Sequence, residues 1–131
     1  MIIMKDANWF ELRGQTIRAI TQLDDDQLIV RTDAAEFVVQ HEQECCESVA
    51  ITHKIGDPTA LVGHTVTLAE EDNPDSPPPG WDPNHSYNAS HTWSVFILEA
   101  GGHRVEFWWL GESNGYYSET VNVYRNDLPN S

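Results

Sequence analysis

The sequence predicts a mainly β fold: a single small antiparallel β-sandwich, or a partly open barrel, with at most one short helix. Short segments rich in β-branched and aromatic residues recur along the chain, and turn signals such as Gly101-Gly102 separate them. Only one short segment, near the start, has a helical pattern. A chain of 131 residues is expected to form one domain, residues 1–131, that buries roughly two-thirds of its unfolded surface.

The first half of the chain begins with the expected helical turn. Residues 6–12 (DANWFEL) would form it, with Asp6 as the cap and Gly14 as its end. Alternating apolar residues then predict strands, of which the second and third should pair as a hairpin. These strands are expected at residues 16–21, 28–30, 37–39, 49–55 and 65–69.

A proline-rich segment, residues 73–90 (NPDSPPPGWDPNHSYNAS), interrupts the strands. Proline removes backbone donors and favours extended geometry, so this segment is expected to be a long loop, held down by Trp81 or Tyr87. Residues 93–98 are apolar on both faces and predict a central strand. The last strands are expected at residues 103–110 and 120–124, with a polar tail at residues 126–131.

Charge is the outlying feature of the composition. There are 21 acidic residues against 7 Lys and Arg, which gives a net charge of −14. This balance disfavours direct binding of nucleic acid and of anionic membranes, and it favours a protein partner with a basic surface. Solubility, or a salty habitat, would also explain it. The candidate acidic surface consists of Asp24, Asp25, Asp26, Glu70, Glu71 and Asp72.

The sequence also bears on location. No apolar run reaches the roughly 18 to 20 residues of a membrane helix, and residues 1–5 are too short for a signal peptide, so a cytoplasmic protein is expected. The two cysteines, Cys45 and Cys46, are adjacent. Successive side chains on a strand point oppositely, so we expect no structural disulfide, one thiol facing inward, and a reducing compartment.

The densest candidate site lies between two apolar segments, at residues 107–124 (FWWLGESNGYYSETVNVY). Asn114-Gly115 accepts positive φ and should close a hairpin there. The turn has three interpretations: a purely structural element, a protein-binding surface built on exposed tyrosines, or a pocket where aromatic rings stack a small ligand. The candidate binding residues are Trp109, Glu112, Ser113, Asn114, Tyr116, Tyr117 and Glu119.

Enzyme signatures are missing. The sequence has no nucleophile elbow, phosphate-binding loop, zinc-protease motif or dinucleotide fingerprint. The segment 41–47 (HEQECCE) contains metal-ligand types, but adjacent cysteines are not the paired spacing of zinc sites. We therefore expect no enzyme activity, no catalytic residue, no metal and no cofactor. A metal-dependent hydrolase using His41, Cys45 and nearby acids is an alternative.

Several motifs together resemble a known family. They are Cys45-Cys46-Glu47-x-Val49, Ala69-Glu70-Glu71, Thr92-Trp93-x-x-Phe96 and Trp109-x-Gly111-x-Ser113-Asn114-Gly115-Tyr116-Tyr117-Ser118-Glu119-x-Val121. The pattern, over residues 14–124, is similar to an uncharacterised family of small proteins carried by bacteriophages and their hosts. The resemblance implies a phage accessory protein, a class that includes inhibitors of host defence, and it carries no mechanism.

Charge and resemblance together favour a phage-encoded binding protein without enzyme activity. It would inhibit a host defence complex in the host cytoplasm, in the manner of an anti-CRISPR protein, with its acidic surface as a nucleic-acid mimic. The alternative from another class is a β-domain that sequesters a nucleotide-like signal at the SNGYYSE turn. The sequence makes no prediction about homo-oligomers.

Overall fold

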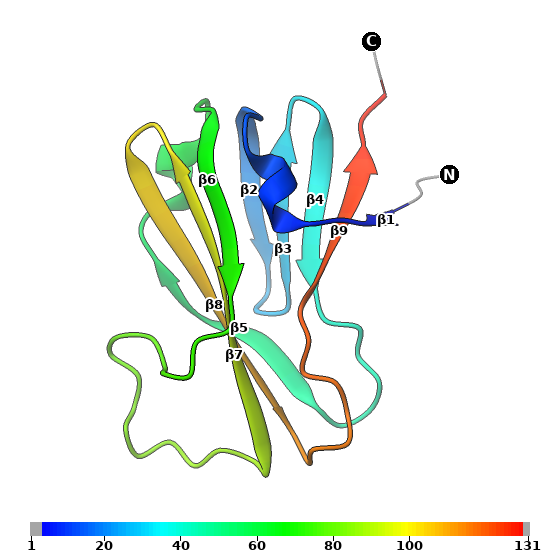
Figure 1. The fold of residues 1–131 in the computed structure, drawn as a ribbon, viewed down its shortest axis with the longest axis vertical. Helices are drawn as coiled ribbons and strands as arrows, with labels where there is room; N and C mark the ends of the chain where they lie inside the picture. Colours follow the sequence, from blue (N-terminus) through cyan, green and yellow to red (C-terminus); the bar gives the residue numbers. More distant parts are fainter. Residues whose placement is uncertain (1–3, 130–131) are drawn as a thin grey trace.

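The computed structural model, which describes residues 4–129, is a sandwich of two antiparallel sheets (Figure 1). The first sheet has the order β1 (Lys5–Asp6), β9 (Asn122–Asp127), β4 (Ala35–Gln40), β3 (Gln27–Thr32), β2 (Ile17–Leu23). The second has the order β5 (Ser48–Ile55), β8 (His103–Ser113), β7 (Ser90–Ala100), β6 (Val66–Asp72). The mainly β prediction is confirmed, in its sandwich form.

The predicted strands are present with shifted ends. The expected hairpin pairs Leu28 of β3 with Val39 of β4, and β7 lies centrally in its sheet, between β8 and β6. The last strand, β9, continues to Asp127 because its residues pair with β4, so the predicted tail at residues 126–131 begins too early. Residues 130–131 of that tail lie outside the described residues.

Two 3-10 turns accompany the sheets: η1 (Trp9–Leu12) and η2 (Pro58–Leu61). The first is the predicted helical turn, but its cap is Asn8, whose backbone N–H donates to the Glu11 carboxylate at 2.7 Å. Asp6 does not cap it, because Asp6 belongs to β1 and pairs with β9. The second was not predicted; since both are single 3-10 turns and residues 4–129 contain no α-helix, the prediction of at most one short helix is confirmed. None of the helices within residues 4–129 has the length and apolar character needed to cross a membrane.

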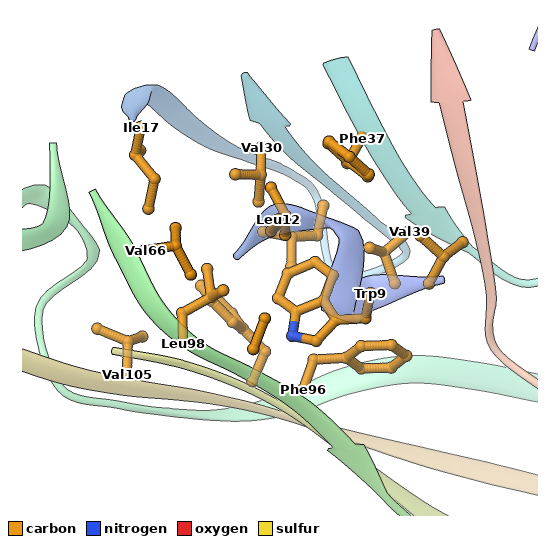
Figure 2. Close-up of a cluster of buried hydrophobic side chains, with 14 of the residues drawn as sticks. Trp9, Leu12, Ile17, Val30, Phe37, Val39, Val66, Phe96, Leu98 and Val105 are labelled. Atoms are coloured by element: carbon orange, nitrogen blue, oxygen red, sulfur yellow. The ribbon is translucent and has the colours of Figure 1, made fainter. Parts of the chain in front are cut away.

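The core lies between the two sheets, where side chains from both converge on η1 (Figure 2). Trp9 is buried against Phe96 of β7 in an edge-to-face pair with centroids 5.3 Å apart, and its Nε1–H donates to the Ile97 carbonyl at 3.0 Å. Leu12 of the same turn belongs to the same buried cluster, as does Phe37 of β4. Burying a side chain of this size stabilises the fold by about 2 kcal/mol, so η1 stabilises the fold by filling the space between the two sheets.

The proline-rich connection covers the outer face of the second sheet. Trp81 and Tyr87 pack on a second apolar cluster that includes Trp93 and Trp108. The Trp81 and Trp93 rings meet edge to face with centroids 4.9 Å apart. Both residues named in the prediction therefore hold the loop, and the central strand is buried on both faces because the loop covers one of them.

The segment between β8 and β9 does not close a hairpin, which corrects the sequence prediction. β8 pairs with β5 and β7 in the second sheet, whereas β9 pairs with β4 and β1 in the first. Both edges of β8 are already occupied, so β9 has no free backbone groups to pair with there. The SNGYYSE segment is instead a crossover between the two sheets.

Candidate functional site

Three connections meet at one end of the sandwich, the lower end in Figure 1. They are residues 41–47, 73–89 and 114–121, and together we call them the acidic pole. They contain six acidic residues and not a single Lys or Arg: Glu42, Glu44, Glu47, Asp75, Asp82 and Glu119. Carboxylates gathered without cations create a local negative potential.

The basic residues all lie elsewhere in the molecule, and four of the seven form ion pairs. Arg125 contacts Asp127 at 2.6 Å and Glu11 at 3.2 Å. Arg104 contacts Glu99 at 2.7 Å and Glu106 at 3.0 Å, while Lys5 and Arg18 pair with Asp127 and Asp33. Within residues 4–129, none of the acids of the pole makes an ion pair with Lys or Arg. The carboxylates of the pole are therefore not offset by Lys or Arg, whereas the rest of the chain has 15 acidic residues alongside all 7 Lys and Arg.

The acidic residues predicted as a surface are all exposed, in two separate groups. Asp24, Asp25 and Asp26 form the turn between β2 and β3, where the Asp25 carbonyl accepts a 2.5 Å hydrogen bond from the Ile51 amide of β5. Asp26 shares a cleft of about 460 Å³ with His41, which joins this turn to the acidic pole.

The second group, Glu70, Glu71 and Asp72, ends β6. These residues border a cleft of about 330 Å³ that Arg13 also lines. Nearby protein atoms displace part of the water around the Glu71 carboxyl, and this desolvation raises its pKa.

A polar cleft of about 380 Å³ opens between the end of β6, the first half of β7 and the crossover; we call it the hydroxyl cleft. Seven of its lining residues carry hydroxyl or amide groups, two are acids, and Val121 is apolar. The polar and acidic residues are Glu71, Asn73, Ser90, Thr92, Ser94, Tyr117, Ser118, Glu119 and Thr120. Three of the hydroxyls alternate along β7, which places them on one face of that strand.

Glu119 is the buried acid of this cleft. Its oxygens accept hydrogen bonds from Thr92 Oγ1 at 2.7 Å and from Ser113 Oγ at 2.5 Å. Burial alone would raise the pKa of the Glu119 carboxyl, but hydrogen bonds from Ser113, Thr92 and Ser90, together with the nearby His91, outweigh it, so the pKa lies below its usual value. Glu119 is therefore ionised at neutral pH.

The close approach of the crossover to β8 depends on Gly111. A Cβ at this position would lie 2.8 Å from the Glu119 Cβ and 2.9 Å from its carbonyl oxygen. No role was predicted for Gly111, although a glycine inside a strand pattern is a sign of such an approach. Nor was one predicted for Ser90, Thr92 and Ser94, whose alternation was the signal for one polar face.

The SNGYYSE turn has the backbone-capping hydrogen bonds that its structural interpretation predicts. Ser113 Oγ accepts from the Gly115 amide at 3.0 Å, and Asn114 Oδ1 accepts from the Tyr116 amide at 2.9 Å. Gly115 has φ +93°, a conformation that favours glycine. Tyr116 is 83% exposed and meets the half-buried Tyr117 edge to face with centroids 5.1 Å apart.

The predicted binding residues thus have different positions. Tyr117 and Glu119 line the hydroxyl cleft, and Tyr116 projects from the acidic pole. Glu112 accepts a 2.9 Å hydrogen bond from the Asn88 amide and so holds the proline-rich connection. Trp109 is fully buried in the core between the sheets, so its ring is not available to stack a ligand.

The cysteines differ from the prediction. Cys45 and Cys46 form a disulfide with each other, and both are exposed. The prediction assumed the alternation of a strand, but these residues form a bend, where that argument does not hold. The inward thiol is therefore wrong, and the cysteines no longer support a reducing compartment.

His41 is not a surface residue, because its side chain is only 4% exposed. Its Nε2 lies 2.6 Å from Glu47 Oε2, and its Nδ1 lies 2.7 Å from the Thr120 carbonyl oxygen. The two side chains on which the metal-dependent alternative rested, His41 and Cys45, are therefore already engaged. Among residues 4–129, no three His, Cys, Asp or Glu side chains come together in a way that could hold a metal ion.

Fold and site together define a small β-sandwich protein with one acidic end and a polar cleft in that end. The chain belongs to the family described as Domain of unknown function (DUF7448), whose model matches residues 11–123. This agrees with the predicted membership of an uncharacterised family over residues 14–124. Comparison with the curated proteins and with the solved structures gives no match.

Proposed function

We propose that this protein is a phage-encoded binding protein without enzyme activity that occupies a basic surface of a host protein in the host cytoplasm. The observation that carries the proposal is the segregation of charge: the acidic pole has six acids and no Lys or Arg. The −14 net charge alone would be explained by solubility, whereas segregation gives the molecule a face with a preferred partner.

The chemistry of the pole favours a partner that handles nucleic acid. Such proteins carry clustered Lys and Arg to neutralise phosphates, and a compact set of carboxylates can replace those phosphates. At physiological salt, charges within about 8–10 Å of each other are not fully screened. Carboxylates on neighbouring connections can therefore attract a partner together. An anti-CRISPR-like inhibitor of a host defence complex fits this description.

Exposed aromatic area at the pole supports protein binding over simple ionic attraction. Tyr116 projects from the connection formed by residues 114–121, with 83% of its surface exposed. Tyrosine supplies large contact area at a small entropic cost and is enriched among residues that dominate binding energy. The SNGYYSE turn therefore offers an anchor inside a negatively charged surround.

The nucleotide-like alternative has less support. Phosphate recognition needs cationic side chains or clustered amide donors, and neither Lys nor Arg lines the hydroxyl cleft. The surrounding pole repels anions as well. We therefore base the proposal on a protein partner.

The test is affinity capture from host cells with purified protein, using charge-matched variants. The pole variant combines Glu42→Gln, Glu44→Gln, Asp75→Asn and Asp82→Asn. The control variant removes the same charge away from the pole through Asp6→Asn, Asp33→Asn, Glu36→Gln and Glu99→Gln. Surface pairs broken in the control are worth little stability, so both variants should fold.

The proposal requires one partner captured by wild type and control and lost by the pole variant. Its affinity should fall at least about tenfold between about 50 and 200 mM salt, and duplex DNA should compete for it. Equal capture by all three proteins, or an affinity that salt does not change, contradicts the proposal.

A further inference from the structure

The hydroxyl cleft presents hydrogen-bond acceptors that the protein itself leaves free. Asn73 Nδ2 donates to the Trp93 carbonyl at 3.1 Å and to Ser94 Oγ at 2.9 Å, and its Oδ1 has no hydrogen-bond donor among residues 4–129. The Glu71 carboxylate has no hydrogen-bond or ion-pair partner among residues 4–129. A ligand in this cleft therefore finds carboxylate and amide oxygens that need donors.

The buried acid of the cleft adds charge without a Lys or Arg partner among residues 4–129. Glu119 is 9% exposed, and the hydroxyls of Ser113, Thr92 and Ser90 donate to it, with the His91 imidazole nearby. A carboxylate offers about four lone-pair positions, so about one remains open beyond these bonds. A buried carboxylate without a Lys or Arg partner gains most from a ligand that brings a cation.

The shape and lining select among cations. A volume of about 380 Å³ lies at the low end of the roughly 300–1,000 Å³ of ligand pockets, which suits one side chain. The acceptors come from three different segments, β6, β7 and the crossover, and a guanidinium with its five N–H donors can satisfy more of them than an ammonium with three. Tyr117 also lines the cleft, and a guanidinium stacks on such a ring better than an ammonium does.

We propose that the hydroxyl cleft is a subsite for the guanidinium group of an arginine side chain. The partner that supplies this arginine is the basic protein of the proposed function, on which this inference rests. Arginine at the surface of the partner would insert between Glu71, Asn73 and Tyr117 while the acidic pole attracts the surrounding charge. The pole would then give attraction and the cleft would give selectivity for arginine over lysine.

A titration with a single residue isolates the cleft from the pole. The probe is N-acetyl-arginine methylamide, followed by amide chemical shifts of the uniformly ¹⁵N-labelled full chain. The matched probes are the lysine analogue and the citrulline analogue, which keeps the shape of arginine without its charge. Variants Glu71→Gln and Tyr117→Ala test the lining, and Glu36→Gln, on β4, is the control. Thermal melts establish that each variant is folded.

The arginine probe should give saturable shifts confined to residues 71–73, 90–94 and 117–121. Citrulline should give none, and lysine should bind about tenfold more weakly. Glu71→Gln should weaken arginine binding about tenfold, the loss expected for one charge-assisted hydrogen bond, while Glu36→Gln should leave it unchanged. Tyr117→Ala should reduce the preference for arginine over lysine.

Shifts that stay linear with concentration and spread over all acidic residues would overturn the subsite. So would equal binding of citrulline, or saturation of the cleft by calcium or a neutral sugar and not by arginine. None of these results touches the capture experiment with the pole variants. A cleft that fails while the pole still binds its partner therefore refutes this inference and leaves the proposed function standing.

Discussion

The imidazole of His41 and the carboxylate of Glu47 lie 2.6 Å apart, with side chains that are 4% and 0% exposed. Glu47 also accepts hydrogen bonds from the backbone amides of Glu44 and Cys45, both at 2.9 Å. The other ring nitrogen of His41 contacts the Thr120 carbonyl oxygen at 2.7 Å. The pair therefore joins two of the three connections of the acidic pole.

This pair gives stability a defined pH dependence. Burial alone would raise the pKa of Glu47, but hydrogen bonds from His41 and from backbone amides lower it from 4.5 to about 2. A carboxyl whose pKa is depressed by folding stabilises the native state above its unfolded pKa and loses that contribution as protons bind. The melting temperature should therefore fall between about pH 4.5 and about pH 2.

The control for this prediction is Glu47→Gln, which keeps the size and the acceptor oxygen. The variant should melt below wild type at pH 6, and the gap between the two proteins should narrow as the pH falls to 2. Other acids contribute equally to both proteins and cancel in the difference. A gap that stays constant over this range would show that Glu47 is not held in its ionised form.

Local sequence patterns predict the strands well because alternation and turn residues act over a few positions. Residues 93–98 are apolar on both faces, and β7 is indeed covered on both. The pairing of distant strands is not written in such patterns. Nothing near Asn114 indicates that both edges of β8 are taken by other strands, so the crossover was predicted as a hairpin.

In the candidate site too, local features could be predicted from the sequence, whereas contacts between distant segments could not. The turn chemistry around Gly115 and the exposure of Tyr116 follow from local residues. The hydroxyl cleft does not, because Glu71 and Glu119 come together only when β6 and the crossover meet at β7. His41 lies in a segment without periodicity, so its burial could not be predicted. It is buried by contacts with Glu47 and with Thr120, which is near the other end of the chain.

Among the glycines in and next to the acidic pole, Gly111 is expected to be the least tolerant of an added methyl group. The added Cβ in Gly111→Ala would meet the Glu119 Cβ at 2.8 Å and its backbone oxygen at 2.9 Å. Overpacking of this kind should lower the free energy of unfolding by about 2 kcal/mol. Urea unfolding of the variant measures the loss.

Gly115→Ala is the matched comparison for this substitution. No atom of residues 4–129 lies within 4 Å of a Cβ at Gly115, so only its φ of +93° is unfavourable. That conformational cost should be about 1 kcal/mol. A larger loss at Gly115 than at Gly111 would mean that the crossover does not pack on β8 as described.

Trp81 is expected to hold the proline-rich connection against the second sheet. Trp81→Ala removes its edge-to-face contact with Trp93 and its contacts with His53 and His85. The free energy of unfolding should fall by about 2 kcal/mol, less than for a fully buried tryptophan. Limited proteolysis should then cut within residues 73–89 much faster than in wild type. Ser86→Ala, an exposed change in the same connection, should leave both the cleavage rate and the stability as they are.

Tyr116 separates binding from folding, because its ring is 83% exposed and its hydroxyl makes no recorded hydrogen bond within residues 4–129. Tyr116→Ala should change the free energy of unfolding by less than about 0.5 kcal/mol. If the acidic pole is the binding face, the same change should weaken binding of the captured partner by about 2 kcal/mol, the loss typical of an aromatic anchor.

The matched control is Phe10→Ala, which removes another exposed aromatic ring. Phe10 is 55% exposed on η1 and lies outside the three connections of the pole. Calorimetric titration of the captured partner should show weaker binding for Tyr116→Ala and unchanged binding for Phe10→Ala. The opposite order would place the partner on the face around η1 instead of on the acidic pole.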